Sequence, residues 1–366
     1  MAEKVLIDGN EAIARGAIAA GCRHFFGYPI TPQNEITEFM SREMPKIGGV
    51  YVQTESESSS VYMVYGGAWT GKRVMTSTSS PGFSLMMEGV SYIAEAEMPA
   101  VIVDVMRMGP GIGTGGQQGQ TDYRQLAKGG GHGAYRNIVI AACSAQECYD
   151  FMQQAFYWAD KYRMLVLVIS DFIIGRSAEL VELRTLELPN DLPDKPWAMM
   201  GRGKKGGIRS FYASAAIAQG GRPPDYHKRI TAHYEQVAKD VLRWESYRTD
   251  DCDLLLASWG SSFRLCKKAV DVARTQGLKW GAFRPITIWP FPEEQLREVG
   301  LKAGRVVTVE DSSGELVEDV RCAMQGKVPV KLVPVWARHT PPGVMAGGSG
   351  LLYPEVIFEE VRKMEW

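Results

Sequence analysis

The stretch Ala100-Val-Ile-Val-Asp-Val-Met-Arg-Met-Gly-Pro-Gly111 decides the fold class of this 366-residue chain. Ala100–Val105 is a short and nearly continuous apolar run, which is typical of a parallel strand buried on both faces. Arg107 follows the run at once, so we expect it at the carboxyl end of a central strand, where open α/β sheets bind their ligands. A guanidinium at that place can bind a carboxylate through two hydrogen bonds.

Outward from this strand, short apolar runs alternate with patterns of helical period. This alternation predicts an α/β fold with an open parallel sheet that is covered by helices on both faces. The expected strands are Phe25–Phe26, Gly49–Gln53, Arg73–Ser77, Asn137–Ala141 and Met164–Ser170. The expected helices are 9–22, with Asn10 as its N-cap, Ser58–Thr70, Pro81–Ala96 and Ala145–Tyr162.

The composition changes after about residue 186, which predicts a first unit over 1–186, a linker over 187–249 and a second unit over 250–366. The linker contains the Gly201–Gly207 stretch and Pro223–Tyr247, which we expect to form one long amphipathic helix. The second unit again alternates. Its expected strands are Asp253–Gly260, Trp280–Phe283 and Val306–Glu310, and its expected helices are Ser262–Gln276, Glu293–Gly300 and Gly314–Met324.

The composition excludes several classes of protein. With 45% hydrophobic and 23% charged residues the chain can bury a core, and a formal net charge of −1 offers no basic field to nucleic acid or anionic lipid. No apolar run reaches the ~18 residues of a membrane span, and the N-terminus lacks the apolar core of a signal peptide. The six cysteines form no Cys-x-x-Cys pair, which suits a reducing cytoplasm. The five histidines indicate no metal site, and only His132, among glycines, merits a test.

A second polar stretch, Gly27-Tyr28-Pro29-Ile30-Thr31-Pro32, follows the strand at Phe25–Phe26. Its two prolines leave the backbone little freedom, so they would hold the Thr31 hydroxyl in place. The same residues would also suit a plain proline-rich turn.

Two further junctions between a strand and a helix carry polar side chains. Gln53-Thr-Glu-Ser-Glu-Ser-Ser-Ser60 brings Glu55 and Glu57 to a helix start, where the helix dipole alone stabilises a carboxylate. Thr76-Ser-Thr-Ser-Ser-Pro-Gly-Phe-Ser84 offers hydroxyls and backbone amides that suit an anionic or carbonyl group, although such loops are also routine helix caps. These local patterns do not choose between Glu55 and Glu57.

Taken together, these stretches resemble the alpha subunit of 2-oxoacid:ferredoxin oxidoreductases. The matching motifs stand in that family's order over nearly the whole chain: Gly27–Pro32, Glu55-Ser-Glu57, Thr76–Gly82, Val103–Gly111 and Phe283-Arg-Pro-Ile-Thr-Ile-Trp-Pro-Phe-Pro292. The resemblance implies that the first unit is the pyrimidine-type domain of a thiamine-diphosphate enzyme. It implies a transketolase C-terminal-like α/β domain for the second unit.

The resemblance also assigns roles to residues. The family's catalytic glutamate maps to Glu57, which would hydrogen-bond the aminopyrimidine ring of thiamine diphosphate so that the ring can deprotonate the thiazolium carbon. Thr31 maps to a residue that binds the carboxylate or carbonyl of the 2-oxoacid, and Arg107 to one that neutralises the carboxylate or helps to bind coenzyme A. The other residues predicted to line the cofactor site are Tyr28, Pro29, Ile30, Ser79 and Ser80.

A multi-subunit enzyme is a further implication. The Gly-Asp-Gly triplet that begins the magnesium–diphosphate motif of thiamine enzymes is absent from the chain. We therefore expect a beta subunit to bind the diphosphate and Mg²⁺, and a ferredoxin-like subunit to carry the iron–sulfur clusters. A gamma subunit would complete the complex and ferredoxin would accept the electrons. The implied reaction is the oxidative decarboxylation of a 2-oxoacid with coenzyme A, and the chain alone is expected to be inactive.

The substrate and two other interpretations stay open. Lys128–Gly133 and Arg284–Pro292 look most like the branched-chain, 2-oxoisovalerate branch of the family. Departures from the family pattern leave 2-oxoglutarate or an aromatic 2-oxoacid as alternatives. These departures are Ser58–Ser60, Met108, Gly113–Gln120 and the Arg338–Gly343 tail. The other interpretations are the beta chain of a lipoyl-dependent 2-oxoacid dehydrogenase and a non-catalytic scaffold subunit.

Overall fold

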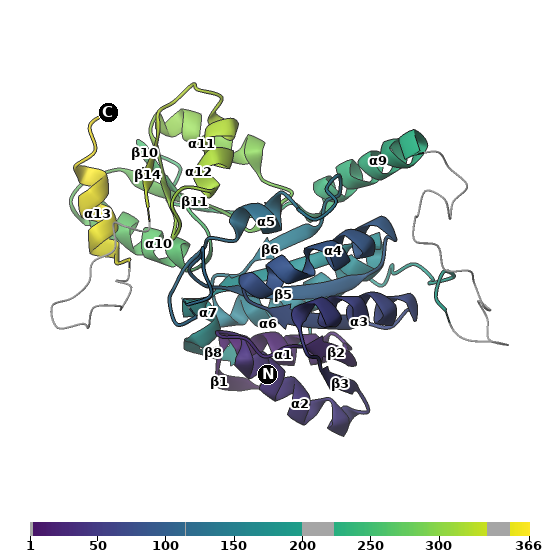
Figure 1. The fold of residues 1–366 in the computed structure, drawn as a ribbon. Helices are drawn as coiled ribbons and strands as arrows, with labels where there is room; N and C mark the ends of the chain where they lie inside the picture. The colour runs from purple at the N-terminus through teal and green to yellow at the C-terminus, as the bar shows by residue number, and fades with distance from the viewer. Residues whose placement is uncertain (1–2, 114, 200–222, 335–351) are drawn as a thin grey trace.

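Seven strands form the larger sheet, in the order β12-β6-β7-β5-β4-β2-β3 (Figure 1). The computed structural model describes residues 3–113, 115–199, 223–334 and 352–366, so the predicted segments 201–207 and 338–343 lie outside the described residues. All neighbouring strands are parallel except β12, which pairs antiparallel with β6. The strands are β2 (His24–Gly27), β3 (Val50–Gln53), β4 (Val74–Thr78), β5 (Ala100–Met106), β6 (Ile138–Ala141), β7 (Leu165–Asp171) and β12 (Thr287–Trp289).

Helices cover both faces of this sheet, as predicted (Figure 1). α3 (Glu57–Trp69) and α4 (Pro81–Glu95) pack on one face, and α1 (Gly9–Ala19) and α6 (Ala145–Tyr162) pack on the other. Side chains of a strand alternate between its faces, so Ile102 of β5 joins the core under α3 and α4, while Val101 and Val103 join the core under α1 and α6. Arg107 therefore follows a central strand that is buried on both faces.

Short elements complete the first unit. β1 (Lys4–Asp8) and β8 (Ala178–Glu182) form a separate two-stranded antiparallel sheet, which the sequence patterns did not predict. The remaining elements are α2 (Asn34–Glu43), a 3-10 turn at Pro45–Ile47, α5 (Tyr123–Ala127) and α7 (Phe172–Arg176).

The expected N-cap of α1 was wrong. The Asp8 carboxylate accepts a hydrogen bond from the Glu11 amide at 2.8 Å, so Asp8 is the cap. The Asn10 side chain instead donates to the Pro32 carbonyl at 2.7 Å and to Glu35 at 2.8 Å. Asn10 thus ties the first helix to the loop that carries Thr31.

The second unit is a five-stranded sheet in the order β14-β13-β10-β11-β9. Its strands are β9 (Trp244–Tyr247), β10 (Leu254–Ala257), β11 (Trp280–Pro285), β13 (Val306–Val309) and β14 (Val330–Val333). α10 (Gly260–Thr275) and α13 (Pro354–Arg362) cover one face. α11 (Glu293–Ala303) and α12 (Leu316–Met324) cover the other, in a core that is continuous with the one under α3 and α4.

The predicted single helix over 223–247 was wrong in its last part. α9 (Pro223–Val241) ends at Val241, and β9 then pairs antiparallel with β11. Val237 and Val241 are buried, as their helical spacing predicted, but Trp244 is 43% exposed and lies on the strand. The chain crosses between the two sheets a second time, because β12 follows β11 directly and pairs with β6 of the larger sheet.

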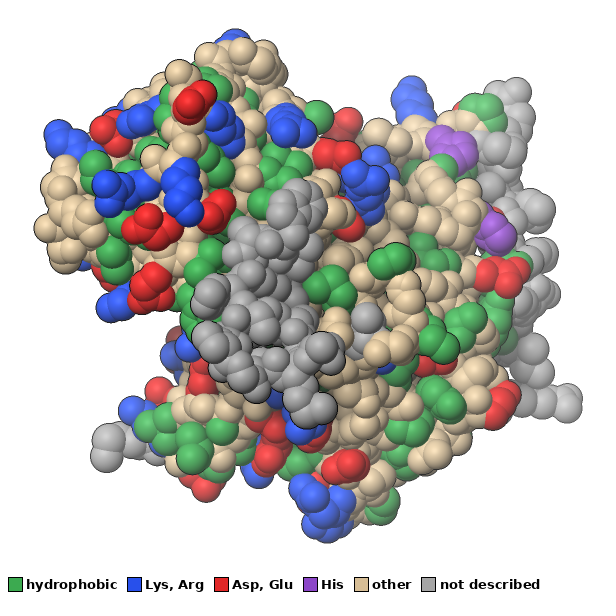
Figure 2. All heavy atoms as spheres, turned by 60° about the vertical axis from the view of Figure 1, so that its left-hand side comes forward, with side chains coloured by type: hydrophobic (Ala, Val, Ile, Leu, Met, Phe, Trp, Pro, Cys, Tyr) green, Lys and Arg blue, Asp and Glu red, His purple; other side chains and the backbone are tan. Residues whose placement is uncertain are grey.

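Lysine and arginine side chains are interspersed with aspartate and glutamate over the face drawn in Figure 2. This distribution agrees with the expected absence of a large basic field on that face. Among the described residues, no helix is both long and apolar enough to cross a bilayer.

Candidate active site

Four neighbouring parallel strands, β3, β2, β4 and β5, end at one edge of the larger sheet. The predicted site residues follow these carboxyl ends, which is where doubly wound sheets hold their ligands. The loop 28–33 follows β2, Glu57 follows β3, Ser79 and Ser80 follow β4, and Arg107 follows β5. The fold therefore gathers residues that lie far apart in the sequence.

Glu57 is the first residue of α3 and is buried, with 4% of its surface exposed. The Ser56 hydroxyl caps the helix by accepting a hydrogen bond from the Ser59 amide at 3.3 Å. No group in the described part of the chain donates a hydrogen bond to the Glu57 carboxylate. Glu55 differs from Glu57 in burial and in hydrogen bonding, because it is exposed and accepts a hydrogen bond from the Ser59 hydroxyl at 2.5 Å.

Gly82 makes room for the Glu57 carboxylate at the start of α4. A Cβ at position 82 would lie 2.5 Å from Glu57 Oε1 and 2.1 Å from Thr78 Oγ1, so only glycine fits there. The carboxylate is thus pressed against the junction between β4 and α4.

Three side chains hold the loop 28–33 through its backbone. The Arg107 guanidinium donates to the Thr31 carbonyl at 2.7 Å, and the side-chain nitrogen of Gln33 donates to the Tyr28 carbonyl at 3.0 Å. Asn10 bonds the Pro32 carbonyl, as described above. Thr31 is exposed, and no partner of its hydroxyl lies among the described residues. Pro29 is exposed as well, and Tyr28 and Ile30 are half-buried.

Arg107 is buried, although it carries a full charge. Its second guanidinium contact is the Ile112 carbonyl at 3.3 Å, and its Nε has no partner in the described part of the chain. Burial lowers the pKa of Arg107, while Asp122, Asp104 and Glu57 act in the opposite direction. Since a guanidinium has five N–H donors, the two carbonyl contacts leave donors for a substrate carboxylate.

Ser79 and Ser80 lie beneath the surface between Glu57 and Arg107. The Ser79 hydroxyl is buried and has no partner among the described residues. The Ser80 hydroxyl accepts a hydrogen bond from the Arg107 amide at 3.2 Å and donates to the Asp122 carboxylate. The Ser80 side chain is therefore already engaged inside the protein.

Two buried carboxyls, Asp104 and Asp122, stand behind this group. Burial raises the pKa of Asp122 to about 6. Burial and the neighbouring Asp122 charge raise the pKa of Asp104 well above its ordinary value. These two buried carboxyls lie near the single guanidinium of Arg107, and their mutual repulsion favours a protonated carboxyl in the pair.

Sequence reasoning missed Asp104 and Gln33 as parts of this region. Asp104 carried a signal, because a charged residue inside the apolar run Ala100–Val105 is seldom buried without a special reason. Gln33 carried none, because a glutamine after a proline-rich loop is ordinary. Its role follows from the fold, in which its side-chain oxygen accepts a hydrogen bond from the Ser77 hydroxyl of β4 at 2.6 Å.

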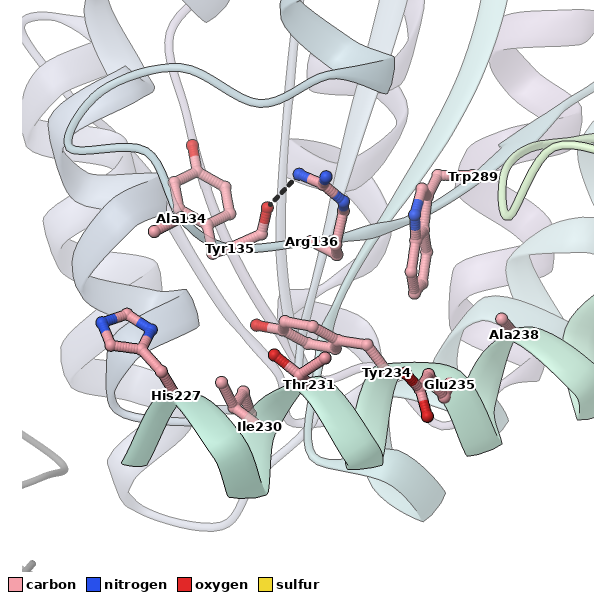
Figure 3. A pocket seen from close by; sticks show the side chains of 10 residues that line it. All are labelled: Ala134, Tyr135, Arg136, His227, Ile230, Thr231, Tyr234, Glu235, Ala238 and Trp289. Carbon is pink, nitrogen blue, oxygen red and sulfur yellow. Dashed lines mark hydrogen bonds between the residues drawn. The ribbon is translucent and has the colours of Figure 1, made fainter. Parts of the chain in front are cut away.

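Two cavities lie away from these residues. One, of about 420 Å³, lies between the two units and is lined by Gln118, Ser261, Arg264 and other residues. The other, of about 410 Å³, lies between α9 and the Ala134–Arg136 loop, with Tyr234 and Trp289 on its walls (Figure 3). No predicted site residue lines either cavity.

The His132 backbone amide donates to Ser91 at 3.0 Å, and its exposed ring packs edge-on against Tyr92 of α4. The described residues contain no group of three or more His, Cys, Asp and Glu side chains that could hold a metal ion. A role for His132 stays a prediction.

Two family models match the chain. Residues 15–247 match the thiamine-diphosphate-binding domain of pyruvate flavodoxin/ferredoxin oxidoreductases. Residues 252–341 match core domain II of pyruvate:ferredoxin oxidoreductase. The predicted fold class, a thiamine-type domain followed by a second α/β domain, is confirmed by these matches.

Individual relatives are similar over most of their length. The ketoisovalerate oxidoreductase subunit VorB of Methanothermobacter marburgensis is 43% identical, over 87% of this chain and 89% of the relative. The 2-oxoglutarate synthase subunit KorA of the same organism is 36% identical, over 91% of this chain and 95% of the relative.

Among solved structures, the 2-oxoglutarate:ferredoxin oxidoreductase of Magnetococcus marinus, with 2-oxoglutarate, coenzyme A and succinyl-CoA bound, superposes with a TM-score of 0.76 at 25% identity. That match covers 99% of this chain but only 65% of the longer chain. A split-gene transketolase, at 13% identity and a TM-score of 0.57, shares the fold.

Proposed function

Because this chain belongs to the 2-oxoacid:ferredoxin oxidoreductase family as an alpha-type subunit, we propose that it forms the cofactor-activating and substrate-binding half of such an enzyme. The complex would oxidatively decarboxylate a 2-oxoacid with coenzyme A, giving an acyl-CoA, carbon dioxide and reduced ferredoxin. The observation that carries the proposal is the Glu57 carboxylate, which is buried at a strand-end cluster and receives no hydrogen bond from the described residues. A carboxylate that is held in place without a protein donor stays available to accept a hydrogen bond from a ligand.

The residues present fit thiamine diphosphate. Glu57 would accept a hydrogen bond from the aminopyrimidine ring and hold a proton at that ring nitrogen. When bound, the cofactor supplies the electron sink for decarboxylation. The space left by Gly82 lets the Glu57 carboxylate take its place. Tyr28, Pro29 and Ile30 would flank the ring from the β2 loop, with Ser79 and Ser80 beneath it.

Arg107 and Thr31 would bind the carboxylate of the 2-oxoacid. The two residues are already joined by the bond from the Arg107 guanidinium to the Thr31 carbonyl. This bond leaves the Thr31 hydroxyl and the remaining guanidinium N–H groups available. A buried guanidinium pairs strongly with a carboxylate. Help in binding coenzyme A is the second role that we assign to Arg107.

Partner subunits would supply what this chain lacks. We assign the diphosphate and Mg²⁺ to a beta subunit, the iron–sulfur clusters to a ferredoxin-like subunit, and a further contact to a gamma subunit. Exposed apolar side chains on the elements that carry site residues support a partner there, since such side chains mark interaction surfaces. They are Tyr62, Met63, Leu85 and Ile112, on α3, α4 and the loop after β5.

For the substrate we propose a branched-chain 2-oxoacid. The supporting observation is the higher identity to the ketoisovalerate relative, 43% against 36% for the 2-oxoglutarate relative. 2-Oxoglutarate is the second candidate, because the similar structure from Magnetococcus marinus was solved with that acid bound. Rates with 2-oxoisovalerate and 2-oxoglutarate, measured on the purified complex, decide between the two acids.

Glu57→Gln tests the proposal, with Glu55→Gln as its control two residues away. In the purified complex, assayed by 2-oxoacid-dependent viologen reduction with coenzyme A, we expect Glu57→Gln to lower the rate by about 10²–10⁴. Glu55→Gln should leave the rate unchanged, because Glu55 is exposed and its carboxylate accepts a hydrogen bond from the Ser59 hydroxyl. Unimpaired reduction by Glu57→Gln would remove Glu57 from the mechanism and favour a scaffold role for the subunit.

A further inference from the structure

Three consecutive residues, Gln120, Thr121 and Asp122, join three different parts of the molecule. They end the glycine- and glutamine-rich loop that follows Arg107, a loop to which the sequence analysis assigned no structural role. Gln120 is fully buried and Asp122 is nearly so. Each of the three side chains bonds a different element. The segment therefore connects the second unit to the backbone around Arg107.

Gln120 bonds mainly the second unit. Its side-chain oxygen accepts from the Ser262 hydroxyl at 3.0 Å and from the Asp311 amide at 3.1 Å. Its side-chain nitrogen donates to the Trp259 carbonyl at 3.1 Å and to the Asp171 carboxylate at 3.2 Å. The two lone pairs and two N–H donors of the amide are all used. The Gln120 backbone amide adds a bond to the Asp311 carbonyl at 2.8 Å.

The second unit is shaped to receive this side chain. Gly260, the first residue of α10, has a φ of +56°, and a Cβ there would lie 2.6 Å from Gln120 Nε2. Asp171, which caps α7 of the first unit, also accepts a hydrogen bond from the Ser261 amide at 2.9 Å. The start of α10, Gln120 and Asp171 are therefore held in one arrangement.

The next two residues bond the active-site side of the junction. The Thr121 hydroxyl accepts from the Gly109 amide at 2.7 Å and donates to the Arg107 carbonyl at 3.3 Å. The Asp122 carboxylate accepts from the Ser80 hydroxyl, which in turn accepts from the Arg107 amide. Both contacts fix the backbone from which the Arg107 side chain projects.

We propose that Gln120-Thr121-Asp122 is a positioning segment that makes the placement of Arg107, and with it the affinity for the 2-oxoacid carboxylate, depend on the docking of the second unit. This inference rests on the substrate role proposed above for Arg107. Gln120 is its central residue, because among these three residues it is the one whose side chain bonds both units. The segment touches no substrate, so it acts through Arg107.

Gln120→Glu is the sharpest perturbation, because it keeps the size of the side chain but replaces its two donors by an oxygen. That oxygen would face the Asp171 carboxylate and the Trp259 carbonyl, both acceptors, and would repel them. Ser262→Ala is a milder second variant, since Gln120 keeps its bond from the Asp311 amide. Tyr123→Phe is the matched control. It removes a hydrogen bond to Asp319 of the second unit at 2.6 Å and leaves Asp319 its ion pair with Lys128.

All variants are assayed in the purified complex by steady-state viologen reduction. We expect Gln120→Glu to raise the KM for the 2-oxoacid about tenfold to hundredfold, with a smaller change in kcat, because a displacement of about 1 Å in a binding group has effects of this size. Ser262→Ala should raise KM by a few-fold, and Tyr123→Phe should not change it. When Arg107→Lys is already present, Gln120→Glu should add little, since coupled residues are not additive.

Hydrogen exchange gives a readout that does not depend on turnover. Gln120→Glu should speed the exchange of backbone amides at 107–109 while leaving those of β4 unchanged, and Tyr123→Phe should do neither. Unchanged exchange at 107–109 in the folded Gln120→Glu complex overturns the positioning role. A raised KM in Arg107→Lys with an unchanged KM in Gln120→Glu overturns it as well. If Arg107→Lys leaves KM unchanged, the proposed substrate role of Arg107 fails, and exchange alone decides whether the segment positions that residue.

Discussion

Gly82→Ala measures how strongly the position of the Glu57 carboxylate controls turnover. The added Cβ would lie 2.5 Å from Glu57 Oε1, 2.8 Å from its Cδ and 2.1 Å from Thr78 Oγ1. Ordinary contacts of heavy atoms are about 3.5 Å or longer, so the carboxylate or the start of α4 has to move by roughly 1 Å. Because a displacement of about 1 Å can cost about 10² in rate, we expect kcat of the purified complex in the viologen assay to fall about a hundredfold.

Two other glycines of α3 and α4 serve as controls. At Gly89 a Cβ would lie 2.4 Å from Val61 Cγ1, so Gly89→Ala strains the contact between these helices two turns of α4 beyond Gly82. Gly66 has no heavy atom within 4 Å of such a Cβ, so Gly66→Ala should be neutral. Circular dichroism establishes that each variant folds. Normal turnover by folded Gly82→Ala, or an equal loss in Gly89→Ala, would refute the idea that the position of the carboxylate limits the rate.

Three further predictions follow from single groups. Thr31→Val keeps the shape of the side chain but removes its hydroxyl, so KM for the 2-oxoacid should rise with kcat nearly unchanged; an unchanged KM in the viologen assay would contradict the assigned contact. Arg284→Met breaks the buried bonds of Arg284 to Glu147 and Glu245 and should lower the free energy of unfolding by about 3 kcal/mol. This value is at the low end of the range for buried ion pairs, because the two carboxylates are 26% and 32% exposed and can hydrate. A loss below about 1 kcal/mol in denaturant titration would count against it. Burial raises the pKa of Asp122 from 3.8 to about 6. The contribution of Asp122 to stability is therefore fully present below about pH 4 and is lost as the pH rises through about 6. In thermal unfolding, Asp122→Asn should show a smaller fall in Tm between these pH values than the unsubstituted chain.

Most elements of the first unit were predictable because their apolar spacing is local. The strand β5 and its exit at Arg107 follow from one apolar run and the residue after it. β9 was not predictable in the same way, because Trp244–Tyr247 extends the spacing of an amphipathic helix. These residues become a strand because the edge of β11 offers partners from Ala282 to Pro285. Pairing partners that lie far along the chain leave no local pattern.

The site was predictable in its residue types and less so in its geometry. A helix start with two glutamates does not reveal which one is buried, and the family motif alone pointed to Glu57. The structure separates the two, since Glu57 turns under α4 at Gly82 while Glu55 stays at the surface. Gln120 had no signal at all, because nothing local distinguishes it from Gln117 or Gln118 in the same loop. The bonds that single it out all cross to other elements.

The site is held through backbone groups, and this suits a site that is shared between subunits. The loop 28–33 and the Arg107 strand end are tied almost entirely through backbone groups: the carbonyls of Tyr28, Thr31, Pro32 and Arg107, and the amides of Arg107 and Gly109. This leaves the Thr31 hydroxyl and the Glu57 carboxylate without partners among the described residues. If these side chains were needed to hold the fold, a cofactor would have to break their bonds before it could bind. Because other groups do that work, the side chains stay available for a cofactor and a substrate.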